Sequence, residues 1–265
     1  QENTTNVVLE ADKIPNTQLT SWTNKYGYFG RAAFNGETII DGMNTEGLSV
    51  SILYLPGSQY PAYDPKDQKP VLAIYDIAPY LLSQARTVSE ALQLLRSQQL
   101  VQSAVKEKEG YFIKGIPIHY VMRDKTGNSA VVEFIKEQVK IYENAGDVMT
   151  NSPPFDWQIK NANYYDSLLA DNKGPNEKFR KSFYQYDEIY KGSTHKGEAN
   201  LMGVPGDATP SSRFVRAKVF LDNFPVPSSR EVALYQASTL IDSLVVPALT
   251  GADPTLWNSI KDLDE

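Results

Sequence analysis

Residues 149–158 of this 265-residue chain are Met149-Thr150-Asn151-Ser152-Pro153-Pro154-Phe155-Asp156-Trp157-Gln158. A carboxamide and a hydroxyl come directly after a strand-like run, and two prolines follow them. Because proline fixes its own backbone and cannot continue a β-ladder, the prolines end the strand in a rigid turn. Residues 156–170 can then form a helix. The sequence therefore predicts a strand, a turn that aims the Asn151 side chain, and a helix.

Two further blocks combine turn residues with polar side chains in the same way. The upstream block is Asp41-Gly42-Met43-Asn44-Thr45-Glu46-Gly47-Leu48. The downstream block is Gly203-Val204-Pro205-Gly206-Asp207-Ala208-Thr209-Pro210-Ser211-Ser212-Arg213-Phe214-Val215-Arg216-Ala217. The three blocks, in this order, resemble the choloylglycine hydrolase and penicillin V acylase family. That resemblance implies an N-terminal-nucleophile fold, a small-molecule amide substrate, and hydrolysis of linear amide bonds by an N-terminal cysteine.

The composition is that of one folded domain. Apolar residues make up 41% and charged residues 22%, and the aromatic share of 11% argues against disorder. At 265 residues the chain can bury a sizeable core, so we expect residues 1–265 to form a single domain. The formal net charge is −6, and no Lys/Arg cluster interrupts it, so nucleic acid is not an expected partner.

Several kinds of site and partner are not expected from the residue types. The chain has no cysteine and only two histidines, which argues against disulfides, thiolate metal sites and multi-histidine metal centres, and no cofactor is expected. No apolar run reaches about 18 residues, so no membrane span is expected. The first residues lack the basic and apolar parts of a targeting peptide, which leaves cytoplasm and export both open.

The strands are predicted by β-branched and aromatic residues between turn signals. Asn35-Gly36 and residues 44–47 mark two turns, and residues 124–128 mark a third. Short turns join antiparallel neighbours, so an antiparallel arrangement is expected. The predicted strands are residues 22–29, 31–34, 48–55, 118–123, 129–135, 140–142 and 147–150.

The helices are predicted by apolar spacing and by capping residues. Residues 71–84 have apolar side chains at helical intervals, although Pro79 is expected to kink the helix or to end its first segment. Thr87 and Glu90 form a capping box at the start of an apolar stripe, and the same logic recurs at residues 228–231. The predicted helical segments are residues 71–84, 88–95, 156–170, 211–224 and 232–244.

The order of the elements is strands, paired helices and strands again, which suits two sheets between helical layers. We therefore expect an α+β fold, a four-layer αββα sandwich of two antiparallel sheets. The helix pair within residues 71–98 would cover one face, and the helices within residues 211–244 the other. Residues 173–200 are polar and tyrosine-rich, which predicts a long surface excursion near a site.

Asn151 is the best candidate for stabilising an oxyanion. Amide hydrolysis passes through a tetrahedral intermediate, and a carboxamide donates hydrogen bonds to the oxyanion without a charge penalty. An asparagine before Ser-Pro can instead satisfy its own backbone in an Asx-turn. The family resemblance implies the first role, because the asparagine of the family's T-N-S-P run helps to line the oxyanion hole.

Arg213 lies in the first turn of a predicted helix, where the macrodipole favours carboxylates over cations. Another interaction must therefore favour an arginine there. A structural salt bridge is one explanation. The resemblance implies a second, because the arginine of the family's S-R-F run lies beside the nucleophile and tunes its electrostatics. Arg216, one turn later, is expected to pair structurally.

Tyr54 lies near the end of the strand predicted over residues 48–55. A tyrosine on a strand is commonly half-buried packing. The resemblance implies more, because the family has an asparagine here in many bile salt hydrolases and an aromatic residue in penicillin V acylases. The aromatic side chain therefore favours phenoxyacetyl-type amides. In the family the backbone N–H at this position is the second oxyanion donor, whatever the side chain.

The two histidines are not expected to act as bases. His119 lies in a strand-like run, which favours a packed histidine with satisfied hydrogen bonds. His195 lies in a polar loop and is expected to be solvated. The G-x-S-x-G pattern of a serine nucleophile is absent from the sequence.

The chain departs from the family where the nucleophile belongs. No cysteine is present, and by the spacing of the three blocks Gln1 corresponds to a position inside a family domain. We therefore expect a piece that lacks the family's nucleophile strand and its last strands, and that does not catalyse by itself. The alternative is a catalytically inactive binding or structural protein on the same scaffold. The resemblance also suggests a homotetramer.

Overall fold

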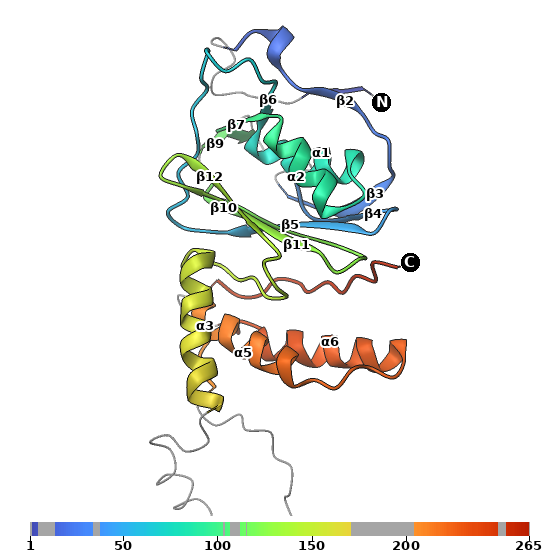
Figure 1. The fold of residues 1–265 in the computed structure, drawn as a ribbon, viewed down its shortest axis with the longest axis vertical. Coiled ribbons are helices and arrows are strands. Elements are labelled where there is room, and N and C mark those ends of the chain that lie inside the picture. Colours follow the sequence, from blue (N-terminus) through green and yellow to red (C-terminus); the bar gives the residue numbers. More distant parts are fainter. Residues whose placement is uncertain are drawn as a thin grey trace, which may run out of the picture. The chain divides into compact units, whose positions relative to one another are not determined.

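The computed structural model describes residues 2–4, 14–33, 38–102, 104–106, 112–114, 116–170, 204–248 and 253–264. These residues form two compact units (Figure 1). The first unit is Gln1–Pro154 with Lys261–Glu265, and the second is Phe155–Ile260. The single domain expected from the chain length stays a prediction. The excursion predicted over residues 173–200, with His195, lies outside the described residues.

The first unit is built on a six-stranded sheet in which every neighbouring pair is antiparallel. Its strand order is β12-β11-β10-β5-β4-β3, so β10 and β5 lie at the centre. The register pairs Leu48 with Asp124 at one end of these two strands, and Tyr54 with Ile118 at the other. This sheet, with its helices, confirms the predicted α+β class. The strands are β3 Tyr28–Ala33, β4 Thr38–Asn44, β5 Leu48–Tyr54, β10 Ile118–Asp124, β11 Ser129–Ile135 and β12 Gln138–Glu143.

Strand β4 is not predicted by the sequence pattern, because Asp41 and Gly42 interrupt its apolar alternation. The structure gives a reason for the glycine. A Cβ on Gly42 would lie 2.6 Å from Leu82 Cδ1 of the helix above the strand. The residue that weakens the strand signal therefore lets the helix pack closely on the sheet.

Two of the predicted strands differ in the structure. Residues 147–150 form no strand, because Gly146 turns the chain with a φ of 75° and Asp147 forms an ion pair with Arg123. The run over residues 22–29 is interrupted, and its two ends belong to the separate strands β2 Ser21–Thr23 and β3. In both places local strand propensity is overridden by contacts made elsewhere in the unit.

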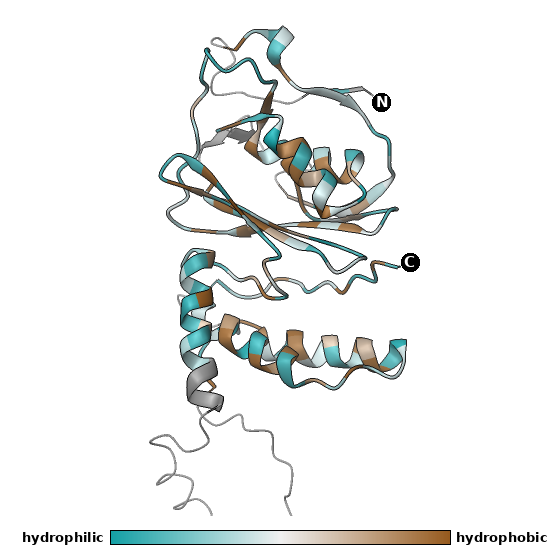
Figure 2. Ribbon diagram, viewed as in Figure 1, coloured by the Kyte–Doolittle hydropathy of each residue, from teal (hydrophilic) through white to brown (hydrophobic). Residues whose placement is uncertain are grey.

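Helices α1 Ile77–Gln84 and α2 Val88–Arg96 lie on one face of the six-stranded sheet. Apolar residues of the two helices and of the strands meet between the layers (Figure 2). Burial of these side chains is the main favourable contribution to the stability of this unit. The core includes Leu48, Val50, Ile77, Leu81, Leu82, Leu92, Leu95, Tyr120, Val132 and Phe134.

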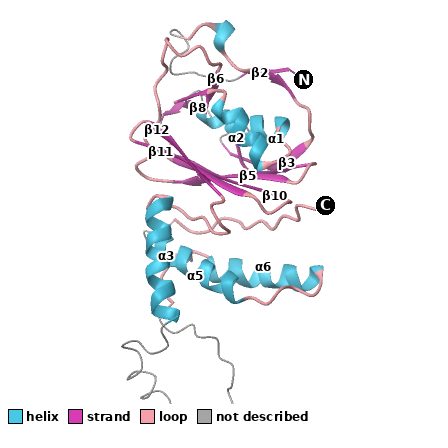
Figure 3. Cartoon of the chain, viewed as in Figure 1, coloured by secondary structure: helices cyan, strands magenta, loops and turns pink. Residues whose placement is uncertain are grey.

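The first half of the segment predicted as a helix over residues 71–84 is not α-helical. Strand β6 Val71–Ala73 pairs in parallel with β7 Gln99–Val101, and a 3-10 turn at Ile74–Asp76 leads into α1 (Figure 3). Pro79 therefore lies in the first turn of α1, where its missing N–H costs no intrahelical bond, and it does not end a helical segment. The remaining short elements of this unit are β1 Glu2–Thr4, η1 Asn16–Gln18, β2 Ser21–Thr23, β8 Ala104–Lys106 and β9 Phe112–Lys114.

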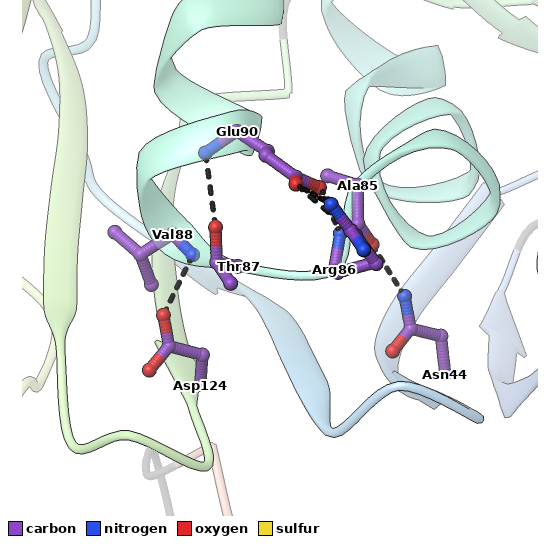
Figure 4. A network of polar contacts seen from close by, with 7 residues as sticks. All are labelled: Asn44, Ala85, Arg86, Thr87, Val88, Glu90 and Asp124. Atoms are coloured by element: carbon purple, nitrogen blue, oxygen red, sulfur yellow. Dashed lines mark hydrogen bonds and ion pairs between the residues drawn. The ribbon is translucent and has the colours of Figure 1, made fainter.

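The connection between α1 and α2 is closed by side chains that cap α2 (Figure 4). Thr87 Oγ1 accepts a hydrogen bond of 3.2 Å from the Glu90 N–H, which confirms the predicted N-cap. The Glu90 carboxylate accepts in return from the N–H of Arg86, at 2.8 Å. From strand β10, Asp124 Oδ2 accepts from the Val88 N–H at 2.8 Å. The first N–H groups of α2 are thereby satisfied from within the chain and from the sheet.

Asn44 holds the same connection from the end of β4 (Figure 4). Its Nδ2 donates to Leu82 O at 2.9 Å and to Ala85 O at 2.7 Å. Its Oδ1 accepts from the N–H groups of Glu46 at 3.1 Å and Leu48 at 2.9 Å. One buried side chain therefore joins the end of α1 to the turn that begins β5.

The second unit contains the helices α3 Phe155–Ala170, α5 Pro210–Asn223 and α6 Arg230–Leu244. Helices α3 and α5 pack through Phe155 and Phe214, whose ring centroids lie 6.3 Å apart. Thr209 caps α5 directly before Pro210, and Ser229 caps α6. Among the helices that the structure describes, none is long and apolar enough to cross a membrane.

Candidate functional site

Tyr54 and Asn151 meet at the C-terminal end of β5. Asn151 Nδ2 donates a hydrogen bond of 2.8 Å to Tyr54 O, across 97 residues of sequence. The carboxamide therefore reaches strand β5, which an Asx-turn confined to its own backbone would not do. The Tyr54 side chain is 53% exposed, so it does not belong to the core. Two of the three predicted site residues are thus in contact.

The backbone direction at Tyr54 is set by the pairing of β5 with β10. Leu55 N–H donates to Pro117 O at 2.8 Å, while Tyr54 lies opposite Ile118. Antiparallel ladders alternate between hydrogen-bonded and non-hydrogen-bonded pairs, so Tyr54 belongs to a non-hydrogen-bonded pair. The N–H and C=O of Tyr54 therefore point away from β10. They share one edge of β5, and the Asn151 carboxamide lies at that edge.

This arrangement combines two neutral hydrogen-bond donors, a backbone amide and a side-chain carboxamide. A carboxamide is an uncharged donor, and Asn151 Nδ2 donates to Tyr54 O. Neutral N–H donors at one edge can stabilise an oxygen that gains negative charge during a reaction. The arrangement therefore suits chemistry in which a carbonyl oxygen becomes an oxyanion.

Arg213, the third predicted site residue, lies in the first turn of α5 in the second unit. Its Nε donates to Ala208 O at 3.1 Å, in the loop before the helix. Burial lowers the pKa of the Arg213 guanidinium, and the neighbouring charge of Arg216 lowers it further. The convergence of Arg213 with Tyr54 and Asn151 stays a prediction.

The loop before α5 is held by two charged residues. Arg216 Nε donates to Ser243 O at 2.8 Å, and its Nη1 bonds to carbonyl oxygens of the loop, so Arg216 has the structural role predicted for it. Asp207 accepts from Ser212 Oγ at 2.7 Å. That hydrogen bond, with those from Thr209, lowers the pKa of Asp207 to about 2. Asp207 was not among the predicted site residues, although an aspartate shortly before Thr-Pro is a helix-start signal.

His119 is buried on β10, as predicted, but its partner is a carboxylate. His119 Nδ1 lies 3.2 Å from Glu133 Oε1, and both side chains are fully buried. His119 Nε2 has no hydrogen-bond partner in the part of the chain that the structure describes, so the prediction of a fully satisfied histidine is wrong for that atom. The signal for this pair is Glu133 itself, the one charged residue in the mostly apolar β11.

Within the described ranges, no group of three or more His, Asp or Glu side chains is placed to hold a metal ion.

A family match covers most of the chain. The model of linear amide C–N hydrolases, choloylglycine hydrolase family, matches residues 2–248. The chain belongs to the choloylglycine hydrolase family. The family predicted from the three sequence blocks is thereby confirmed.

Relatives in this family include both kinds of hydrolase. A bile salt hydrolase/transferase of Clostridium perfringens is 31% identical, over 76% of the chain and 57% of the relative. A penicillin V acylase of Pectobacterium atrosepticum is 28% identical, over 83% of the chain and 62% of the relative. The chain thus spans 57% and 62% of the length of these two relatives.

Solved structures of family members have the same fold. The penicillin V acylase from Agrobacterium tumefaciens superposes with a TM-score of 0.66 at 27% identity, over 93% of the chain and 62% of that structure. A mutant of the conjugated bile acid hydrolase from Clostridium perfringens gives a TM-score of 0.64 at 25% identity, over 90% of the chain and 68% of that structure. The predicted fold of N-terminal-nucleophile hydrolases is confirmed by these similarities.

Proposed function

We propose that the chain is part of a hydrolase of linear amide bonds, in which Tyr54 and Asn151 bind the oxyanion of the tetrahedral intermediate. The observation that carries this proposal is the hydrogen bond of 2.8 Å between Asn151 Nδ2 and Tyr54 O. This bond places the Asn151 carboxamide at the same edge of β5 as the Tyr54 N–H. Membership of the choloylglycine hydrolase family supports the reaction class.

The proposed reaction begins when a cysteine thiolate attacks the carbonyl carbon of the amide. The carbonyl oxygen becomes an oxyanion, which is proposed to accept hydrogen bonds from the Asn151 carboxamide and from the N–H of Tyr54. The intermediate then collapses, the C–N bond breaks, and the amine leaves with the proton that the thiol gave up. Water hydrolyses the resulting thioester to a carboxylic acid and restores the thiol.

The nucleophile is proposed to be the N-terminal cysteine that the family resemblance implies. The 265 residues contain no cysteine. We therefore place the nucleophile in the polypeptide outside these residues, and we expect these residues alone to have no amidase activity. The lack of cysteine within them also favours a second candidate, a catalytically inactive binding or structural protein on the same scaffold.

Arg213 is proposed to lie beside that nucleophile. A cationic neighbour stabilises a thiolate over the neutral thiol. Burial lowers the pKa of Arg213, which means that its charge is poorly solvated in the folded protein. The resemblance of Ser212-Arg213-Phe214 to the family's S-R-F run supports this place for Arg213.

The acyl group of the substrate is proposed to be aromatic. The Tyr54 ring is 53% exposed next to the oxyanion-binding pair, so an aryl group can stack against it. Phenoxyacetyl-type amides, such as penicillin V, are therefore proposed ahead of conjugated bile salts. The relatives include hydrolases named for both substrates, which makes the preference a matter for experiment.

The test is an Asn151→Ala substitution in a form of the protein that carries the N-terminal cysteine. We expect kcat to fall by about 10²–10³-fold with little change in KM, the usual loss for one oxyanion donor. Asn128→Ala is the matched control, since Asn128 follows the opposite end of β10 and its Nδ2 donates to Thr126 Oγ1 at 2.8 Å.

Three outcomes would contradict parts of this proposal. Full kcat in Asn151→Ala would remove Asn151 from the oxyanion site. Turnover by the 265-residue chain without a cysteine would exclude the proposed nucleophile. Failure of the cysteine-bearing form to hydrolyse penicillin V or a conjugated bile salt would favour the inactive protein on the same scaffold.

A further inference from the structure

At the start of β10, next to Tyr54, side chains form the hydrogen bonds that a neighbouring strand would otherwise form with the backbone. The pairing of β11 with β10 begins at Tyr120. Ile118 shares the non-hydrogen-bonded pair with Tyr54, so its N–H and C=O point toward the edge that β11 does not reach. The loop after β5 satisfies both groups. Tyr60 Oη accepts from the Ile118 N–H at 2.7 Å, and Ser58 Oγ lies 3.1 Å from Ile118 O.

Tyr60 bonds to the backbone on both sides of Pro117. Its hydroxyl donates to Ile116 O and accepts from the Ile118 N–H. Pro117 has no N–H of its own, but its carbonyl accepts from the Leu55 N–H at 2.8 Å. One phenol therefore fixes the short segment to which the end of β5 is bonded.

The Tyr60 ring is itself held rigidly. It is 7% exposed, and its centroid lies 5.0 Å from that of Phe134 and 6.5 Å from that of Tyr75, both in edge-on contacts. Burial raises the pKa of Tyr60 well above its usual value, so the hydroxyl keeps its proton and remains a donor. Because the ring is fixed and the hydroxyl is protonated, the two hydrogen bonds of Tyr60 hold residues 116–118 in one position.

We infer that Tyr60 is a positioning residue for the oxyanion-binding pair. A shift of residues 116–118 would move Leu55, and with it the Tyr54 carbonyl that holds the Asn151 carboxamide. Oxyanion donors must match the reacting geometry to within about 0.5 Å, so such a shift would lower kcat. The catalytic consequence rests on the proposed function, whereas the positioning of the strand end does not.

The test compares two conservative variants. Tyr60→Phe keeps the ring and removes the hydroxyl that bonds on both sides of Pro117. Tyr75→Phe is the matched control, because Tyr75 Oη donates to the same Ile116 O, at 3.0 Å, from a ring that is also buried. Both variants lose one buried hydroxyl, so a merely structural role for Tyr60 predicts similar effects. Thermal melting checks that each variant folds, and Ser58→Ala replaces Tyr60→Phe if that variant does not.

The first readout is amide hydrogen exchange in the full chain, which needs no activity. We expect Tyr60→Phe to speed exchange at the Leu55 and Ile118 N–H groups by about tenfold, because local opening then needs fewer broken bonds. Tyr75→Phe should leave both rates within about twofold. Equal acceleration in the two variants, or none in Tyr60→Phe, would overturn the positioning role.

The second readout is the kinetics of the cysteine-bearing form. We expect Tyr60→Phe to lower kcat by about tenfold with KM within about twofold, and Tyr75→Phe to leave both near the wild-type values. Unchanged kcat in a Tyr60→Phe variant with faster exchange would remove the catalytic consequence. Absence of hydrolysis by the parent form would contradict the proposed function alone, and the exchange rates would then decide the positioning role.

Discussion

Two asparagines lie near opposite ends of β5, and they differ in burial: one holds the fold, and the other is proposed to bind an oxyanion. Asn44 is buried and takes part in four hydrogen bonds, two as donor and two as acceptor. These use both amide hydrogens and both lone pairs of its oxygen. Asn151 is only half-buried and donates to a carbonyl at an exposed strand end. The same type of side chain therefore holds the fold at one end and is proposed to bind an oxyanion at the other.

The two ends of β5 also differ in what holds them. At the first end, Asp124 and the cap of α2 close the connection between α1 and α2 (Figure 4). At the second end, Tyr54 is 53% exposed, and Tyr60 holds the segment of β10 to which Leu55 is bonded. A rigid support next to an exposed residue lets that residue bind a ligand without carrying the fold. The difference predicts that substitutions at the two ends separate stability from activity.

The largest effect is expected from the comparison of Asn44→Ala with Asn151→Ala. The first substitution leaves buried carbonyl and N–H groups without their partner, so we expect the free energy of unfolding to fall by about 3 kcal/mol. The second should change it by less than about 1 kcal/mol, because the position is only half-buried. Chemical denaturation of the full chain measures both values. Equal losses in the two variants would end the distinction between the two asparagines.

Asp124, at the first end, makes the stability of that end depend on pH. Burial raises the pKa of Asp124, but hydrogen bonds from Thr126, Val88 and Asn128 together outweigh it, and the net pKa is below the usual value. A lowered pKa contributes stability that is present above the unfolded value of about 3.9 and is lost as the pH falls through the folded pKa. We expect Asp124→Asn to cost about 1 kcal/mol at neutral pH.

The measurement is the stability of wild type and Asp124→Asn across a pH series. The gap between the two proteins should be constant at neutral pH and should narrow below about pH 4, where Asp124 binds a proton first in the unfolded chain and, at lower pH, in the folded protein. A gap that persists unchanged into acid would mean that the charge of Asp124 contributes nothing to the first end.

The sequence predicts the first end of β5 better than the second, because the signals at the first end are local. The Thr87 cap and the turn before Leu48 are encoded within a few residues, and both appear in the structure. Strand β4 is not predicted, because Gly42 weakens its strand pattern. The reason for this glycine is its close approach to Leu82, which lies far away in sequence. The strand expected over residues 147–150 does not form for a related reason. Strand propensity does not show that Gly146 turns the chain or that Asp147 forms an ion pair with Arg123.

The second end could not be derived from local patterns at all. Nothing around Tyr54 or Asn151 indicates that residues 97 apart are hydrogen-bonded, and only the family resemblance brought them together. Tyr60 has no motif either, because its role depends on where β11 stops pairing with β10. The sequence shows Glu133 as a charged residue in an apolar strand, but its pairing with His119 follows only from the strand register.

The smallest effect is expected from Tyr54→Asn, which changes the side chain at the second end and keeps its backbone N–H. Loss of the exposed ring removes stacking on an aromatic acyl group, an interaction of about 1 kcal/mol. We therefore expect the ratio of kcat/KM for penicillin V over a conjugated bile salt to fall about fivefold in the cysteine-bearing form. Stability should hardly change, because the Tyr54 side chain is 53% exposed.

Phe29→Asn is the matched control for Tyr54→Asn, since Phe29 is an aromatic residue that is 65% exposed on the edge strand β3. It should leave the ratio of the two kcat/KM values unchanged. An unchanged ratio in Tyr54→Asn would show that the ring does not contact the acyl group. An equal fall of kcat/KM for both substrates in Tyr54→Asn would instead show that the Tyr54 side chain supports the oxyanion geometry and does not select the acyl group.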